Sequence, residues 1–198
     1  MKKSIRILSA LLLAAAILCG CVGCAGAGNS GVYTVGICQL TQHPALDEAT
    51  RGFREALTEK LGDKVRFNEQ NAQNEATNCS TICNQFVANK VDLILANATP
   101  ALQSAAAATA EIPILGTSIT DYATALNMTD WTGTSGRNIS GTSDLAPLTE
   151  QADMLLTLFP DVKKVGILYC SAEPNSKYQA TVVSDYLATK NVTCTEYT

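Results

Sequence analysis

The chain has 198 residues, of which 46% are hydrophobic and 16% charged, a composition typical of globular proteins. This length suffices for one full domain and part of a second. The formal net charge is −4 and no cluster of Lys and Arg occurs, which argues against a nucleic-acid partner because phosphate binding needs clustered basic residues.

The first 20 residues predict an export signal. Lys2, Lys3 and Arg6 precede an apolar run from Ile7 to Leu18, which small residues follow. A membrane-spanning helix needs about 20 apolar residues, and this run is shorter. Residues 1–20 are therefore interpreted as a signal peptide rather than as a transmembrane anchor.

A cysteine at the end of this signal predicts a lipid anchor. Residues 18–21 read Leu-Cys-Gly-Cys, which resembles a bacterial lipobox, in which an aliphatic and a small residue precede the lipidated cysteine. Cys21 is the predicted lipidation site and Cys24 the alternative; an ordinary secretory peptide is the other interpretation. Acyl chains hold a protein on a membrane at about 0.8 kcal/mol per buried methylene. The expected location is the extracytoplasmic face of the cell membrane.

Residues 21–31 are small and glycine-rich, as in a flexible tether, and residues 32–141 alternate between strand and helix patterns. The expected strands are 33–39, 65–71, 92–97 and 112–117, and the expected helices 45–61, 75–89 and 100–110. This alternation predicts a doubly wound parallel sheet with right-handed crossovers. From residue 121 to 141 the pattern breaks into Thr, Ser, Gly and Asn.

Residues 142–198 predict a second α/β lobe that is incomplete. Its expected helices are 147–159 and 175–190, and its expected strands 164–170 and 192–197. Val35-Gly36-Ile37 in the first strand is echoed by Val165-Gly166-Ile167, which agrees with two similar lobes.

Five cysteines lie beyond the export region, so at least one is unpaired within the chain. Cys79 and Cys83 are spaced i, i+4, but they belong to an apolar helical stripe, so core packing is favoured over a disulfide or a metal site. The pairing is left open for Cys38, Cys79, Cys83, Cys170 and Cys194. The single histidine, His43, argues against a zinc site, and no cofactor is predicted.

Ligands of open parallel sheets bind beyond the carboxyl ends of the strands, near helix N-termini. This rule selects four junctions, at residues 39–44, 97–100, 116–121 and 171–176. Pro44, Pro100 and Pro174 stand where first helical turns are expected. Thr99 is interpreted as the N-cap of the helix at Pro100, as a ligand-binding residue, or as both. No G-x-S-x-G, P-loop or H-E-x-x-H motif occurs, so an enzyme is not predicted.

Several blocks of the sequence, in the right order, resemble one family. These are "VGICQLTQHPALDEATRGF", "NEQNAQNE", "DLILANATPALQSAAAAT", "IPILGTSITD", "NISGTSDLAP" and "KKVGILYCSAEPNSKYQ". Over about residues 33–197 the chain is similar to the ABC transporter substrate-binding lipoproteins of the tryptophan/tyrosine type. The resemblance implies a type I periplasmic-binding-protein fold, in which two Rossmann-like lobes close on a small solute. It also implies an ABC permease and ATPase as partners.

The resemblance also implies the residues that line the solute pocket. They are Gln39, Thr99, Ser118, Asp121, Asp144, Ser171, Glu173 and Ser176. Thr99 and Ser118 would hold a carboxylate, and Asp144 or Glu173 would pair with an ammonium. Asp144 is alternatively a cap for the helix near Pro147, and Glu173 alternatively a solvated carboxylate of the first helical turn.

The chain departs from this family in two pocket loops, which leaves the ligand open between an aromatic and another amino acid or a related solute. It has Asp121-Tyr122 where the family has Asp-Pro, and Cys170-Ser171-Ala172-Glu173 where the family favours Asn-Ser-Ser-Glu. Family members are longer, so a truncated or partial chain is expected. A tethered sensor domain is the alternative function. A neighbouring gene for a permease or for a histidine kinase would distinguish the two.

Overall fold

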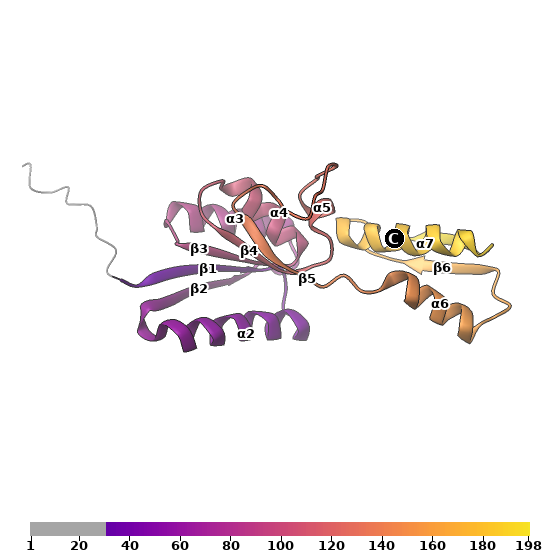
Figure 1. Cartoon of the computed structure of the whole chain (residues 1–198). Helices are drawn as coiled ribbons and strands as arrows, with labels where there is room; N and C mark the ends of the chain where they lie inside the picture. The colour runs from indigo at the N-terminus through magenta and orange to yellow at the C-terminus, as the bar shows by residue number, and fades with distance from the viewer. Residues whose placement is uncertain (1–30) are drawn as a thin grey trace, which may run out of the picture. The chain divides into compact units, whose positions relative to one another are not determined.

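The computed structural model describes residues 31–198. The predicted signal peptide, the predicted lipidation of Cys21 and nearly all of the predicted tether lie outside these residues. The described part holds a five-stranded and a two-stranded sheet, each flanked by helices (Figure 1). Between residues 31 and 198, no helix is long and apolar enough to cross a membrane.

The five-stranded sheet is parallel throughout, which confirms the predicted doubly wound arrangement. Its strands occur in the order β2-β1-β3-β4-β5. They are β1 (Tyr33–Gln39), β2 (Val65–Asn71), β3 (Leu93–Asn97), β4 (Ile114–Ile119) and β5 (Ile139–Ser143). Gln39 at the end of β1 pairs with Asn71 of β2 and Asn97 of β3, so the carboxyl ends of these strands form one polar edge.

Helices cover both faces of this sheet. They are α2 (Pro44–Leu61), α3 (Ala76–Ala88) and α4 (Thr99–Ala108), with a 3-10 turn η1 (Gly62–Lys64) after α2. On one face, Val35 and Ile37 pack with Phe53 and Leu57 of α2. On the opposite face, residues of the same strands pack against α3 and α4 (Figure 1). The alternation of side chains along each strand places its apolar residues in both cores.

The short helix α5 (Tyr122–Ala125) and the edge strand β5 were not predicted. Only Ile139 of β5 is buried, so the strand carries no apolar alternation. Backbone pairing with β4 holds it, and the Asn138 side chain donates to the Ile112 carbonyl at 2.6 Å. β4 itself begins two residues later than predicted, because the Thr109 hydroxyl accepts from the Glu111 and Ile112 N–H groups and holds a turn there.

The two-stranded sheet is also parallel, as the second alternation predicted. Its elements are α6 (Leu148–Leu158), β6 (Lys164–Leu168), α7 (Pro174–Thr189) and β7 (Thr193–Tyr197). Ala152, Leu187 and Val192 form its small buried core. Neither β6 nor β7 contains a buried residue, and Leu168 and Tyr197 are 82% and 57% exposed.

Cys79 and Cys83 confirm the core-packing interpretation of the apolar stripe. Cys79 and Cys83 of α3 are fully buried, as is Cys38 of β1, and all three are free thiols. Cys170 is an exposed thiol and Cys194 a half-buried one.

Candidate functional site

A chain of buried hydrogen bonds joins the carboxyl ends of β1 and β3 to the first turns of α2. The Asn97 side-chain amide donates to the Leu46 carbonyl at 2.8 Å and to the Thr50 hydroxyl at 2.9 Å. The Thr50 hydroxyl donates to the Gln39 side-chain oxygen at 2.7 Å, and the Gln39 amide donates to Asp47 at 2.6 Å. Gln39, Thr50 and Asn97 are each at most 5% exposed. This network fixes the strand ends and leaves the Gln39 side chain fully bonded.

Two buried polar atoms next to this network have no hydrogen-bond partner among the described residues. They are Oδ1 of Asn97 and the hydroxyl oxygen of Thr99. Because the Asn97 nitrogen must donate to the Leu46 carbonyl, the orientation of its amide is fixed and Oδ1 is the unpaired atom. A buried polar atom without a partner costs about 1–3 kcal/mol, so such atoms are uncommon in native proteins.

The structure corrects the interpretation of Thr99 as an N-cap. α4 begins at Thr99 itself, its N-cap residue is Ala98, and no side chain caps the helix. Thr99 is 2% exposed, and its hydroxyl lies at the start of the helix without accepting a helical N–H. The free N–H groups of the first turn make this point favourable to anions.

Backbone strain accompanies the ends of β3 and β4. The backbone angle φ is 92° at Ala98 and 57° at Ser118. Residues other than glycine seldom adopt such positive values. The pairing of β4 with β5 shifts register between Gly116 and Ile119, so Ser118 lies on an irregular strand end. Such strain concentrates at ligand-binding positions, where the surrounding structure holds it.

Asp121 caps the short helix α5. Its carboxylate accepts from the Thr124 N–H at 2.6 Å. The neighbouring Tyr122 hydroxyl donates to the Gly116 carbonyl at 3.1 Å, and the Tyr122 ring stacks on Trp131 with centroids 6.4 Å apart. Burial, with a smaller contribution from the Asp144 charge, raises the pKa of Tyr122 to about 12. Tyr122 therefore packs the end of β4 and keeps its proton.

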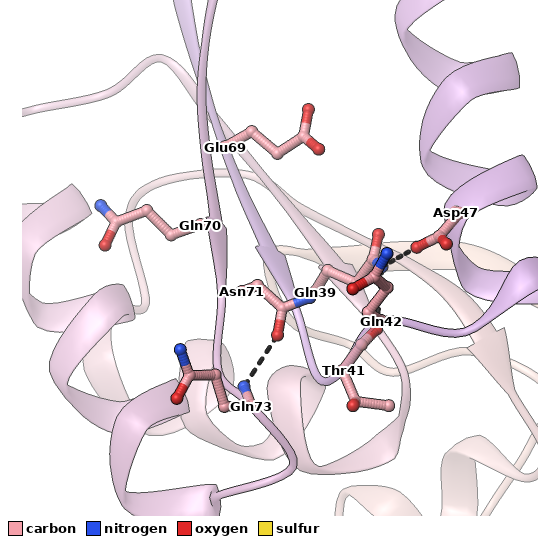
Figure 2. A pocket seen from close by; sticks show the side chains of 8 residues that line it. All are labelled: Gln39, Thr41, Gln42, Asp47, Glu69, Gln70, Asn71 and Gln73. Carbon is pink, nitrogen blue, oxygen red and sulfur yellow. Dashed lines mark hydrogen bonds between the residues drawn. The ribbon is translucent and has the colours of Figure 1, made fainter.

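A polar hollow of about 630 Å³ opens beside the ends of β1 and β2 (Figure 2). Every side chain around it is polar or acidic: Gln39, Thr41, Gln42, Asp47, Glu69, Gln70, Asn71 and Gln73. Within this set, Gln39 is the one residue that the sequence predicted for the site. Asn71 stabilises the wall by accepting from the Gln73 N–H at 2.8 Å (Figure 2). The hollow suits a hydrophilic group with hydrogen-bond donors, since its lining is rich in carboxylate and amide oxygens.

Asp144 lies just after β5, near the end of β4. Its side chain is exposed and its backbone N–H donates to the Ile119 carbonyl at 3.0 Å. The alternative interpretation of Asp144 as a helix cap is wrong, because α6 begins at Leu148 with Pro147 as its N-cap residue and no side-chain cap. Its carboxylate remains free of any hydrogen bond or ion pair between residues 31 and 198.

The remaining predicted residues lie at the end of β6 and the start of α7. Glu173 precedes Pro174 at the N-cap position, and its carboxylate accepts from the Ser176 hydroxyl at 3.3 Å and from the Asn175 amide at 3.4 Å. Ser171 is exposed. In the first sheet, Gln39 is linked to Asn97 through Thr50, and Thr99 follows Asn97 by two residues. In the second sheet, Glu173 and Ser176 lie together at the start of α7.

Sequence reasoning missed three residues of this edge: Asp47, Thr50 and Asn71. Asp47 and Thr50 are spaced one helical turn apart on α2, which places both toward the strand ends. Thr50 is the one buried residue of α2. A threonine on the helix face that packs against the sheet, where apolar residues are usual, was the signal that could have revealed it. The predicted first-turn positions of the three prolines are confirmed, and His43 is the N-cap of α2, where its side chain accepts from the Ala45 N–H.

Comparison with known proteins identifies the family of this chain. The family model of the ABC transporter substrate binding protein matches residues 34–198. The chain is 37% identical to the tyrosine-binding protein of Clostridioides difficile strain R20291, over 96% of this chain and 58% of that protein. It superposes on the ABC domain from Streptococcus pneumonia, solved with L-Trp, with a TM-score of 0.77 and 33% identity over 84% of this chain and 57% of that one.

The chain belongs to the ABC transporter substrate-binding protein family, whose members bind solutes and are not enzymes. Its fold is that of type I periplasmic binding proteins. The leucine-binding protein of Thermotoga maritima, 16% identical, shares this fold with a TM-score of 0.65 over 84% of this chain. The chain spans 57–58% of the length of the tyrosine-binding relative and of the streptococcal structure.

Proposed function

We propose that the protein is the solute-binding lipoprotein of an ABC importer and that its ligand is an amino acid, with an aromatic one first among candidates. The family match and the names of two relatives support this proposal, because one is a tyrosine-binding protein and the other was solved with L-Trp. In the proposed function the ligand binds between two lobes, and a permease and ATPase receive it.

The observation that carries the proposal is the pair of buried atoms, one at the end of β3 and one at the start of α4, that have no hydrogen-bond partner among the described residues. The Thr99 hydroxyl can donate to a carboxylate, and the first-turn N–H groups of α4 add favourable dipoles for the same charge. Asn97 Oδ1 can accept from a ligand N–H. An α-amino acid offers both partners at once, since it carries a carboxylate and an ammonium on one carbon.

Charge complementarity for the ammonium comes from carboxylates near the same edge. Asp47 and Glu69 line the polar hollow, and Asp144 lies just after β5, where its carboxylate has no hydrogen bond or ion pair within residues 31–198. Asp144 and Glu173 remain the predicted partners of the ligand ammonium. Ser118, Ser171 and Ser176 remain predicted pocket residues with hydroxyl groups that can donate or accept.

A lipid anchor at Cys21 completes the proposal. An importer's binding protein must stay close to its permease, and acylation of Cys21 would hold it on the extracytoplasmic face of the membrane. Mass spectrometry of the exported protein tests this part directly. An unmodified Cys21 at the mature N-terminus would refute lipidation there.

Isothermal titration calorimetry tests the ligand. The protein, made at its full encoded length, is titrated with L-tyrosine, L-tryptophan, L-leucine and a panel of other amino acids and small metabolites. We expect saturable heat with at least one amino acid. The absence of heat with all of them, from protein whose circular dichroism shows it folded, would overturn the amino-acid ligand.

A matched pair of variants tests the unpaired hydroxyl. Thr99→Val removes it at nearly constant volume and is expected to weaken binding about 10–100-fold, the loss of one hydrogen bond to a charged group. Thr81→Val removes an exposed hydroxyl of α3 and serves as the control, with unchanged affinity. Equal affinities of the two variants would exclude Thr99 from the ligand site.

A further inference from the structure

β5 leaves the first sheet beside an irregularity of β4. Gly116 of β4 pairs with Gly141 of β5. The next pair is Ile119 with Ser143, so three residue steps on β4 face two on β5. One extra residue on one strand is a β-bulge, which interrupts the ladder of backbone hydrogen bonds. At this point the two strands are held by fewer backbone hydrogen bonds than a regular ladder supplies.

The Tyr122 hydroxyl spans this bulge. It lies 3.1 Å from the Gly116 carbonyl oxygen of β4 and 3.3 Å from the Thr142 carbonyl oxygen of β5. A phenol donates a single proton, which these two carbonyls share. The Tyr122 ring stacks on Trp131 with 9° between the ring planes, which keeps the ring in place. This contact, the Tyr122 bridge, joins β4 to β5 where their ladder is interrupted.

Glycines on both strands make room for the Tyr122 bridge. A Cβ atom added to Gly116 would come within 2.5 Å of the Tyr122 oxygen. A Cβ atom added to Gly141 would overlap that oxygen and the Gly116 carbonyl oxygen. Because Gly116 and Gly141 are paired in register, the hydroxyl fits a gap that a larger residue on either strand would close. The bridge therefore requires tyrosine on α5 and glycine on each strand.

The β5 end of the Tyr122 bridge lies two residues before Asp144. Between them, the Ser143 hydroxyl donates to the Thr120 carbonyl at 2.9 Å. The Asp144 N–H donates to the Ile119 carbonyl at 3.0 Å, while the Asp144 side chain is exposed. A fixed backbone with an exposed carboxylate presents its charge in a defined place.

We propose that Tyr122 is a positioning residue of the solute site: its hydroxyl holds the end of β5 against β4 and thereby places the Asp144 carboxylate. The inference rests on the proposed function, in which Asp144 is a predicted partner of the solute ammonium. A carboxylate that is in place before the solute arrives loses less conformational freedom on binding, which favours affinity. The effect of Tyr122 on the solute passes through Asp144.

Amide hydrogen exchange tests the Tyr122 bridge without any solute. Tyr122→Phe removes the hydroxyl and keeps the ring. In the full chain, nuclear magnetic resonance is expected to show that the Asp144 amide exchanges about 3–10-fold faster in this variant than in the wild type, because one net hydrogen bond is lost. Gly141→Ala displaces the hydroxyl without changing Tyr122 and is expected to speed this exchange at least as much. Unchanged exchange of the Asp144 amide in these variants overturns the proposal.

Tyr186→Phe is the matched control. Tyr186 is half-buried, as Tyr122 is, and its hydroxyl donates to the Asp153 carboxylate at 2.7 Å, which joins α7 to α6. The control removes one hydrogen-bonded phenol hydroxyl away from the bridge, and the Asp144 amide is expected to exchange as in the wild type. Equally fast exchange in Tyr186→Phe and Tyr122→Phe would assign the effect to global stability and overturn the bridge.

A double-mutant cycle tests the role in binding. Wild type, Tyr122→Phe, Asp144→Asn and the double variant are titrated by calorimetry with L-tyrosine, L-tryptophan and L-leucine, and with the rest of the panel if none of these binds. We expect affinity to fall about 3–10-fold in Tyr122→Phe and about 10-fold or more in Asp144→Asn. The double variant is expected to bind within about twofold of Asp144→Asn alone, because the two residues act as one unit. Tyr186→Phe is expected to bind as the wild type does.

The possible results separate this inference from the proposed function. When the wild type binds an amino acid, three results overturn the inference alone: unchanged affinity in Tyr122→Phe, unchanged affinity in Asp144→Asn, and fully additive losses in the double variant. Absence of binding by the folded wild type overturns the proposed function and with it the role of Tyr122 in binding, whatever the exchange measurement shows.

Discussion

The same tripeptide pattern has different surroundings in the two sheets. Val35-Gly36-Ile37 in β1 lies between two helix layers, with Val35 and Ile37 at most 2% exposed. Val165-Gly166-Ile167 in β6 is half-buried or exposed throughout, and Leu168 beside it is 82% exposed. The burial of a strand residue is therefore decided by the layers that cover the strand and not by the residue type alone. Large apolar side chains left on one surface favour association with further protein.

The functional residues follow the same division. At the polar edge of the first sheet, the side chains of Gln39, Thr50 and Asn97 are buried and held by short hydrogen bonds. At the start of α7, Glu173 and Ser176 are half-buried and joined by a hydrogen bond of 3.3 Å. The first group is preorganised by a complete core, whereas the second rests on a small one.

A pair of phenylalanine truncations gives the sharpest test of this difference. Phe86→Ala removes a fully buried ring over Gly36 and is expected to lower the free energy of unfolding by about 3–5 kcal/mol. Phe159→Ala removes a ring that is 62% exposed and is expected to change it by less than about 0.5 kcal/mol. Urea unfolding followed by circular dichroism measures both. Equal losses would contradict the contrast between the sheets.

The carboxylates of Asp121 and Glu173, each at the start of a helix, test whether predicted site residues of the first sheet are held more firmly than those of the second. Asp121 accepts from the Thr124 N–H, so Asp121→Asn, which retains capping ability, and Asp121→Ala, which does not, are expected to differ by about 1 kcal/mol in stability. Glu173 makes no cap hydrogen bond, so Glu173→Ala is expected to leave stability nearly unchanged. The same variants, titrated with the solute that binds, separate capping from ligand binding. A destabilised Glu173→Ala protein would show that α7 depends on this residue.

The smallest expected effect is a pH dependence in the alkaline range. The pKa of Tyr122 is raised to about 12, chiefly by burial, so the folded state holds this proton more tightly than the unfolded chain does. Its contribution to stability is complete below pH about 10 and is lost as pH rises toward 12. Tyr122→Phe is expected to remove this part of the alkaline decline. Fluorescence of Trp131, the only tryptophan, reports the transition.

Tyr169 is the matched control for that measurement. A hydrogen bond to the Glu196 carboxylate raises the pKa of Tyr169 as well, but this residue is half-buried and lies next to the second sheet. Tyr169→Phe is therefore expected to leave the alkaline unfolding curve of the first sheet unchanged. A shift of that curve in Tyr169→Phe would assign the decline to a different group.

Most of the fold could be predicted from sequence because hydrophobic alternation and helical spacing are local signals. β1 and β2 have the predicted bounds, and Pro44, Pro100 and Pro174 lie in first helical turns, where proline is favoured. β5 could not be predicted, because it has one buried residue and is held by pairing with β4. Thr99 was misread as a cap because the positive φ of Ala98 has no local signature.

The sequence by itself determined the order of strands and helices, the polar character of the four strand ends and the resemblance to substrate-binding lipoproteins. Periodicity, charge and turn chemistry are written along the chain, so no tertiary information was needed for them. Only the tertiary structure decided that Thr50 links Gln39 to Asn97, that the Thr99 hydroxyl is buried without a partner among the described residues, and that Cys38 and Cys79 are buried in one core. These contacts join residues far apart in sequence, and packing of helices on a sheet is what brings such residues together.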